Sequence, residues 1–135
     1  MHAIGLALAL VVIGCGTEYT PPTSFIDIYP TLFPVETRTQ CNFCHALPPN
    51  DKSNGMLSMG IDPATAYQAL MATSVSSHCG GMALLVPLRP EESLLWLKLD
   101  AMPTCGDRMP LGGTPLTAAQ LDLVKSWILT GAPEY

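Results

Sequence analysis

The chain has 135 residues, 48% of them hydrophobic and 13% charged, which is enough for one small domain and excludes a multidomain enzyme. Eleven acidic against six basic residues give a formal net charge of -5, which argues against a nucleic-acid partner held through its phosphates. Thirteen prolines and eleven glycines exclude long coiled coils, and the few aromatic side chains (three Phe, four Tyr and two Trp) favour a core that contains something besides side chains.

The N-terminus carries an uncharged apolar run, AIGLALALVVIG, over residues 3–14. The run is shorter than the roughly 20 residues of a transmembrane helix and has the length of a signal-peptide core. Met1 and His2 depart from the usual pattern, since they supply no Lys or Arg before the run. We therefore predict a signal peptide over residues 1–14 and export of the rest.

The apolar run ends in VIGCG at residues 12–16, which resembles the lipobox of bacterial lipoproteins. The resemblance implies that Cys15 is lipidated and becomes the N-terminal residue of a lipid-anchored protein. The alternative for Cys15 is a free thiol near the cleavage site. Residues 15–23, the cysteine followed by GTEYTPPT, are expected to form a tether to one domain over residues 24–135. The expected location is the periplasmic or cell-surface face of a bacterial membrane.

The spacing of apolar residues in 24–135 predicts an all-α domain of four short helices. The signals for helix starts are an N-cap at Ser24, an Asp-Pro pair at 62–63, Pro-Glu-Glu at 90–92, and a capping box of Thr117 with Gln120. Gly131 is expected to end the last helix, and no alternating run is long enough to predict a sheet. The side chains expected to face inward are Phe25, Ile28, Leu32, Ala66, Leu70, Met71, the apolar residues of 94–99, Leu121, Val124 and Ile128.

Residues 41–45, CNFCH, form a C-x-x-C-H sequence, the attachment signature of c-type haem. Two thiols three residues apart on a helical turn can bond to the two haem vinyl groups, while the next imidazole faces the iron. The sequence therefore predicts thioether bonds from Cys41 and Cys44, with His45 as the proximal ligand. A thioredoxin-type dithiol lacks the required strand and βαβ context. A structural zinc site would add Cys79 and Cys105, although these two lack the C-x-x-C spacing.

Three further segments accompany this motif: PEESLLWLKL at 90–99, CGDRMPLGG at 105–113 and LTAAQLDLVKSWILTGAP at 116–133. Together they resemble a small class I cytochrome c domain, most closely the minimal single-haem domains of bacterial cell-surface lipoproteins. The resemblance covers most of residues 24–135. It implies a bundle of short helices around one covalently bound haem c. In that bundle an N-terminal helix runs into the attachment motif and a C-terminal helix packs across it.

The sixth iron ligand is expected to be Met109, in the GDRMP segment at 106–110 between the third and last helices. Cytochromes c place the distal Met in such a loop, and Pro110 stiffens it. Met56 and Met59 follow His45 too soon in the chain to be favoured. The other candidates are His78, Met82, Met102 and an iron with an open distal side, and Met71 and Met82 are expected in the pocket or core.

Five further residues have two interpretations each. Cys79 and Cys105 are expected to form a disulfide in an oxidising compartment and to tie the Met109 segment to the body, with separate free thiols as the alternative. Arg108 is either a partner of a haem propionate or a solvated charge. Trp96 and Trp127 are expected to line the core and haem pocket rather than to relay electrons.

The sequence thus predicts an exported, membrane-anchored, monomeric cytochrome that carries electrons through one His/Met-ligated iron and has no catalytic residues. Redox proteins are the expected partners, and nucleic acid is not. Two alternatives remain open at this point. One is a haem peroxidase or gas-binding domain with an open distal side, and the other is a zinc-binding surface lipoprotein.

Overall fold

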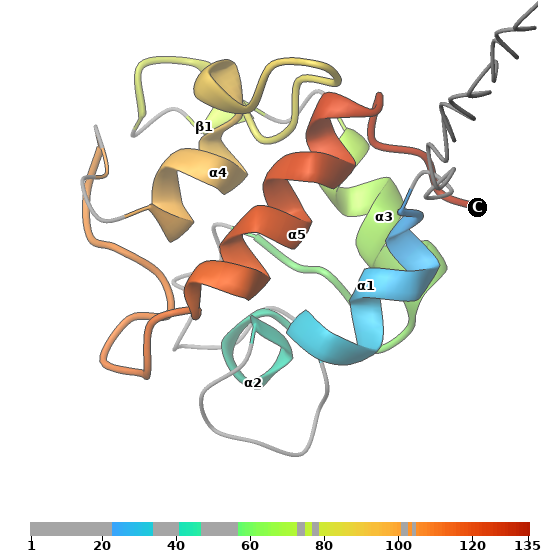
Figure 1. Cartoon of the computed structure of the whole chain (residues 1–135). Coiled ribbons are helices and arrows are strands. Elements are labelled where there is room, and N and C mark those ends of the chain that lie inside the picture. The colour runs from blue at the N-terminus through green and yellow to red at the C-terminus, as the bar shows by residue number, and fades with distance from the viewer. Residues whose placement is uncertain are drawn as a thin grey trace, which may run out of the picture.

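The computed structural model describes residues 23–33, 41–46, 57–72, 75–76, 79–100, 103 and 105–135. The predicted signal peptide, Cys15 and the predicted tether as far as residue 22 lie outside this part of the chain. The helices are α1 (Phe25–Leu32), α2 (Cys41–His45), α3 (Pro63–Met71), α4 (Leu94–Leu99), α5 (Ala118–Leu129) and the 3-10 helix η2 (Pro90–Glu92). The all-α prediction is confirmed, since only a two-stranded ribbon accompanies these helices in the described residues. In Figure 1, α5 crosses the molecule between α4 on one side and α1 with α3 on the other.

Helix α1 begins at the N-cap that the sequence predicts and is held at that end by the C-terminal tail. Ser24 Oγ accepts a hydrogen bond from the Asp27 N–H, and the Asp27 carboxylate reaches back to Ser24, which completes a capping box. The next two N–H groups, of Phe25 and Ile26, donate to the carbonyls of Pro133 (2.9 Å) and Glu134 (3.2 Å). The tail that follows α5 therefore satisfies N–H groups that a helix start leaves without partners.

The core lies where α1, α3 and α5 meet. Phe25 is fully buried, and its ring centroid lies 5.2 Å from that of Trp127 and 5.6 Å from that of Tyr67. Trp127 is also fully buried and donates from Nε1 to the Pro133 carbonyl (2.9 Å), so it is a core residue as predicted. Trp96 on α4 is only half-buried, and the Lys125 ammonium lies 5.5 Å from the centre of its ring.

Helix α3 begins where the sequence predicts, but not all of the residues predicted to face inward are buried. Asp62 is the N-cap and accepts from the Thr65 N–H, which lowers the pKa of this carboxyl below its usual value. Ala66 and Leu70 are buried, whereas Met71 is 38% exposed. The prediction that Met71 faces inward is wrong, because it follows Leu70 by one residue and so lies about 100° away around the helix.

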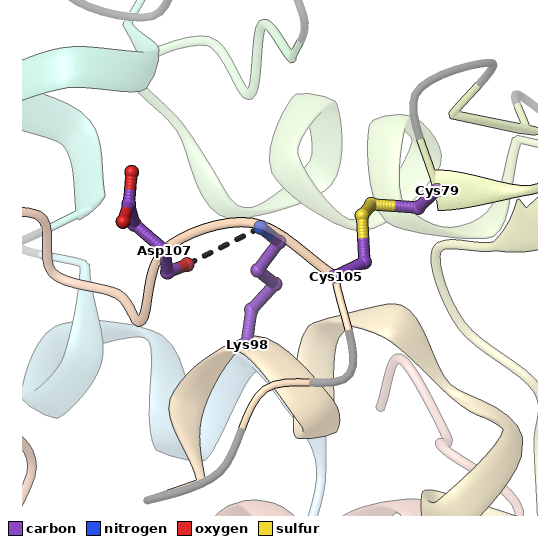
Figure 2. The surroundings of a disulfide bond; sticks show 4 residues. All are labelled: Cys79, Lys98, Cys105 and Asp107. Carbon is purple, nitrogen blue, oxygen red and sulfur yellow. Dashed lines mark hydrogen bonds between the residues drawn. A yellow bond between two sulfur atoms is a disulfide. The ribbon is translucent and has the colours of Figure 1, made fainter.

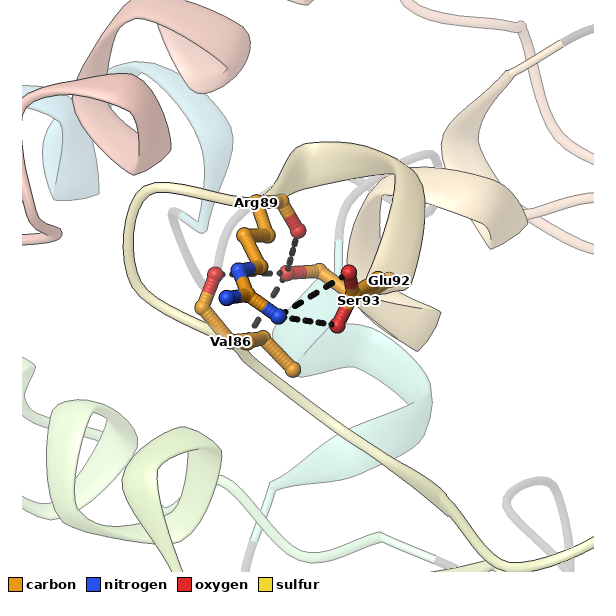
Figure 3. A network of polar contacts seen from close by, with 4 residues as sticks. All are labelled: Val86, Arg89, Glu92 and Ser93. Atoms are coloured by element: carbon orange, nitrogen blue, oxygen red, sulfur yellow. Dashed lines mark hydrogen bonds and ion pairs between the residues drawn. The ribbon is translucent and has the colours of Figure 1, made fainter.

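Residues 90–99 form two helical pieces where the sequence suggested one. Ser93 separates η2 from α4 with an extended backbone and is fully buried. Its hydroxyl accepts a hydrogen bond from the Val86 N–H (2.9 Å) and lies within donating distance of the Arg89 carbonyl (2.9 Å), as Figure 3 shows. A serine hydroxyl that binds the backbone in this way competes with continuous helix. The exposed Arg89–Glu92 ion pair (3.1 Å) spans the same turn.

The two-stranded ribbon consists of β1 (Val75–Ser76) and β2 (Met82–Ala83), paired antiparallel. The sequence did not predict it, because strands of two residues are too short to show an alternating pattern. Gly80 and Gly81, in the turn between the strands, have φ angles of 66° and 82°. Such left-handed angles favour glycine.

Helix α5 begins and ends as predicted. Thr117 and Gln120 form the capping box, and Val124 and Ile128 are buried, although Leu121 is only half-buried. Gly131 has a φ of 99° and donates its N–H to the Ile128 carbonyl (3.0 Å). This left-handed residue ends the helix and turns the tail back toward α1.

Candidate functional site

The C-x-x-C-H motif forms a helix of its own. Helix α2 spans Cys41–His45, so both thiols and the imidazole belong to a single turn or slightly more. Residues three and four apart lie on the same side of a helix, which brings Cys44 and His45 near the side on which Cys41 lies. Both cysteines are free thiols and half-buried, and Cys41 packs against the hydrophobic core. Figure 1 shows α2 at the same end of the molecule as the C-terminal end of α1 and the start of α5.

The His45 side chain is held in one orientation by a hydrogen bond. Its Nδ1 lies 2.9 Å from the carbonyl oxygen of Leu57. A carbonyl only accepts, so Nδ1 carries the proton, and the lone pair of the neutral imidazole is on Nε2. A histidine that ligates a metal characteristically donates its other ring N–H in this way. His45 is therefore oriented as an Nε2 ligand.

A second contact fixes the main chain of His45. The Met59 N–H donates to the His45 carbonyl at 2.6 Å, so residues 57–59 hold both the side chain and the backbone of this histidine. Met59 is 2% exposed and belongs to the core. Because its backbone is bonded to His45, Met59 is poorly placed to ligate the opposite face of a haem. The sequence reasoning did not find Leu57 as a partner, since a backbone carbonyl is present at every residue and has no side-chain signature.

Two polar groups belong to the segments that carry or contact His45, the Ser58 hydroxyl and the Cys41 thiol. Ser58 Oγ is buried and has no hydrogen-bond partner among the described residues. Such a group is costly unless something else binds it, and a haem brings polar propionates as well as an apolar ring. Burial also raises the pKa of the Cys41 thiol to about 12, helped by the neighbouring Cys44. The two thiols of α2, the oriented His45 imidazole and the unpaired Ser58 hydroxyl are groups that a covalently bound haem could use.

Met109 lies in a loop, residues 105–110, that we call the Met109 loop. Its side chain is half-buried and packs against the core, and its N–H donates to the Lys98 carbonyl at 2.7 Å. Arg108 Nε donates to the Leu99 carbonyl (3.1 Å), and Lys98 Nζ donates to the Asp107 carbonyl (3.2 Å), as Figure 2 shows for the latter. The loop is thus attached to the C-terminal end of α4.

Of the other candidates for the second axial ligand, only some lie in the described part of the chain. Met82 lies half-buried in β2. Met56, His78 and Met102 lie outside the described residues. Met109 is therefore the candidate with the best-defined surroundings in the described part of the chain.

Cys79 and Cys105, the pair that the sequence predicts, lie at disulfide distance. Their sulfur atoms are 1.97 Å apart and their Cα atoms 5.5 Å apart (Figure 2). The bond joins the turn between β1 and β2 to the start of the Met109 loop. It also removes two ligands from the four-cysteine zinc site, and no group of three His, Cys, Asp or Glu side chains in the described residues is arranged to hold a metal ion.

Comparison of the chain with protein-family models, with curated proteins and with solved structures finds no match. Among the described residues, no helix combines the length and the apolar character needed to cross a membrane. The assignment of a function therefore depends on the attachment motif and on the contacts around it.

Proposed function

We propose that this protein is an exported c-type cytochrome, with one haem c bound covalently through Cys41 and Cys44, that acts as an electron carrier. The observation that carries the proposal is the contact between His45 and Leu57. It supports His45 as the proximal ligand, because the proton on Nδ1 leaves Nε2 available to the iron. The attachment motif and the contact are independent, since Leu57 lies outside the motif.

The residues in and around α2 would have separate roles in binding the haem. Each thiol of α2 can form a thioether bond with one vinyl group of the haem. The two bonds would hold the haem on a single short helix. The segment 57–59 keeps the imidazole oriented, and the buried Ser58 hydroxyl can bind a propionate. When bound, the haem supplies an iron that cycles between the ferric and ferrous states.

Met109 is proposed as the second axial ligand. The Met109 loop is attached to α4 and the Met109 side chain packs against the core, which supports a well-fixed position for this thioether. A thioether favours the ferrous state relative to an imidazole, which suits a carrier that must accept an electron. Two fixed axial ligands also leave no position for a substrate, which separates an electron carrier from a peroxidase.

Export and anchoring belong to the same proposal. The Cys79–Cys105 pair at disulfide distance supports an oxidising compartment, where such bonds persist. The lipobox-like segment supports a lipid anchor on Cys15 at the outer face of a bacterial membrane. Redox proteins are the proposed partners, and the carrier would act as a monomer.

The proposal is tested by producing the full chain together with cytochrome c maturation enzymes. Haem that stays on the chain in a denaturing gel is expected for the parent and for a Cys79→Ala/Cys105→Ala control, but not for Cys41→Ala/Cys44→Ala. An absorption band from thioether-to-iron charge transfer is expected in the ferric parent. A parent without covalent haem would contradict the proposal, and covalent haem with an open distal side would favour the peroxidase or gas-binding alternative.

A further inference from the structure

The Met109 loop caps the C-terminal end of α4. The last carbonyls of a helix have no partner inside it, and α4 ends at Leu99. The carbonyl of Lys98 accepts the Met109 N–H (2.7 Å), and that of Leu99 accepts Arg108 Nε (3.1 Å). The main chain of the proposed ligand and the side chain before it therefore complete the end of one helix.

The three residues from Cys105 to Asp107 each make or permit a different contact with the rest of the protein. Cys105 is bonded to Cys79, and the Asp107 carbonyl accepts from Lys98 Nζ (3.2 Å; Figure 2). Gly106 lies between them with a φ of 57°, and a Cβ at this position would lie 2.8 Å from Lys98 Nζ. The chain can approach the lysine this closely because residue 106 has no side chain.

Arg108 has the chemistry for holding this end of α4. A helix C-terminus carries partial negative charge, so a guanidinium placed there is favoured electrostatically. Its Nε is engaged by the Leu99 carbonyl, and the side chain is half-buried. A hydrogen bond with a charged donor is stronger than one between neutral groups. Arg108 immediately precedes Met109 in the sequence. A hydrogen bond that fixes Arg108 therefore also limits the movement of Met109, the proposed iron ligand.

We propose that Arg108 is a positioning residue, which holds the Met109 loop on α4 so that the Met109 thioether resists replacement by ligands from solution. This inference rests on the proposed His45/Met109 ligation. It gives Arg108 a role in addition to the two stated earlier, propionate partner and solvated charge.

The test is a titration of the ferric holoprotein with imidazole, a ligand that competes with a thioether for iron. The measured quantity is the imidazole concentration that removes half of the thioether absorption band. In Arg108→Gln, which retains polarity but loses the charge, we expect this concentration to fall about tenfold. Arg108→Lys keeps the charge, so its half-point imidazole concentration is expected to lie between those of Arg108→Gln and the parent. It is also the variant to titrate if Arg108→Gln does not fold.

Two controls separate positioning from general effects. Arg89→Gln removes an exposed arginine of the same type, paired with Glu92 beyond the other end of α4. Tyr67→Phe removes one hydrogen bond, to the Ala132 carbonyl (3.0 Å), on the opposite side of the core. Both are expected to match the parent in the imidazole titration. An equal fall in Tyr67→Phe would show that any loss of stability loosens the ligand, and would overturn the inference.

The remaining outcomes distinguish the inference from the proposed function. A parent with the thioether band and an unchanged Arg108→Gln titration overturns the role of Arg108 alone. A parent with covalent haem but no thioether band overturns the Met109 assignment and the inference with it. A parent without covalent haem overturns the proposed function itself.

Discussion

His45 Nδ1 donates a hydrogen bond of 2.9 Å to the carbonyl oxygen of Leu57, twelve residues later in the chain. This contact places the proton on the ring nitrogen that faces the protein and leaves Nε2 for a ligand. It therefore assigns a direction to the imidazole that the five-residue motif does not.

Met109 is expected to determine the coordination of the iron. Met109→Ala should remove the thioether band and allow carbon monoxide or cyanide to bind, and Met109→His should lower the reduction potential, since imidazole is the stronger donor to ferric iron. Redox titrations with visible spectra measure both effects. The matched control is Met71→Ala, because Met71 is 38% exposed on α3 and should leave the spectrum unchanged. A Met109→Ala protein with the parent spectrum and potential would transfer the assignment to another residue.

The disulfide is expected to stabilise the fold without affecting haem attachment. Its cysteines are separated by 26 residues, and the loop-entropy relation gives about 3.5 kcal/mol for a loop of that length. Cys79→Ala/Cys105→Ala should therefore lower the free energy of unfolding by about that amount, measured by denaturant titration, while the covalent haem remains. Counting free thiols in the denatured, unreduced parent is the companion measurement. Two more reactive thiols in the parent than in the Cys79→Ala/Cys105→Ala variant would contradict the bond.

Gly106 and Gly112 form a matched pair for testing the contact with Lys98. Both have left-handed backbone angles, with φ values of 57° and 67°, so alanine at either should cost about 1 to 2 kcal/mol of stability. Only at Gly106 does the new Cβ meet Lys98 Nζ, at 2.8 Å, and displace it from the Asp107 carbonyl. Gly106→Ala should therefore increase the sensitivity of the thioether band to imidazole, while Gly112→Ala should not. Identical titrations would mean that the lysine contact does not restrain the loop.

Ser93 is expected to be important for stability despite its distance in sequence from the attachment motif. Its buried hydroxyl accepts a hydrogen bond from the Val86 N–H, and alanine would remove this partner (Figure 3). The Arg89 carbonyl, which the hydroxyl also contacts, would still accept from the Glu92 N–H (3.2 Å). Ser93→Ala should lower the free energy of unfolding by about 2 to 3 kcal/mol. Ser126→Ala, at an exposed position within α5, is the control and should be neutral or slightly stabilising. Equal stability of the two variants would show that the Ser93 network contributes little.

Cys15→Ser is expected to release the protein from the membrane fraction while the haem spectrum stays the same. The lipid would be attached to this residue, and the predicted tether separates it from the domain. Fractionation with and without detergent measures the change. Continued association of the variant with membranes would indicate that the apolar N-terminal run itself is the anchor.

The sequence by itself determined those features that depend on side chains a few residues apart. The caps at Ser24, Asp62 and Thr117 each bind a backbone N–H three residues later, and all three are present in the structure. The spacing from Cys41 to His45 is equally local. Such features are readable because they need particular side chains at particular offsets.

Only the tertiary structure decided how these local pieces are joined. The Leu57 carbonyl orients His45, the carbonyls of Lys98 and Leu99 hold the Met109 loop, and residues 133–134 complete the start of α1. Each of these partners is a main-chain carbonyl, which every residue of the chain carries. Sequence shows no preference among them, and the choice is made when packing around Phe25 and Trp127 brings one particular carbonyl within hydrogen-bonding distance.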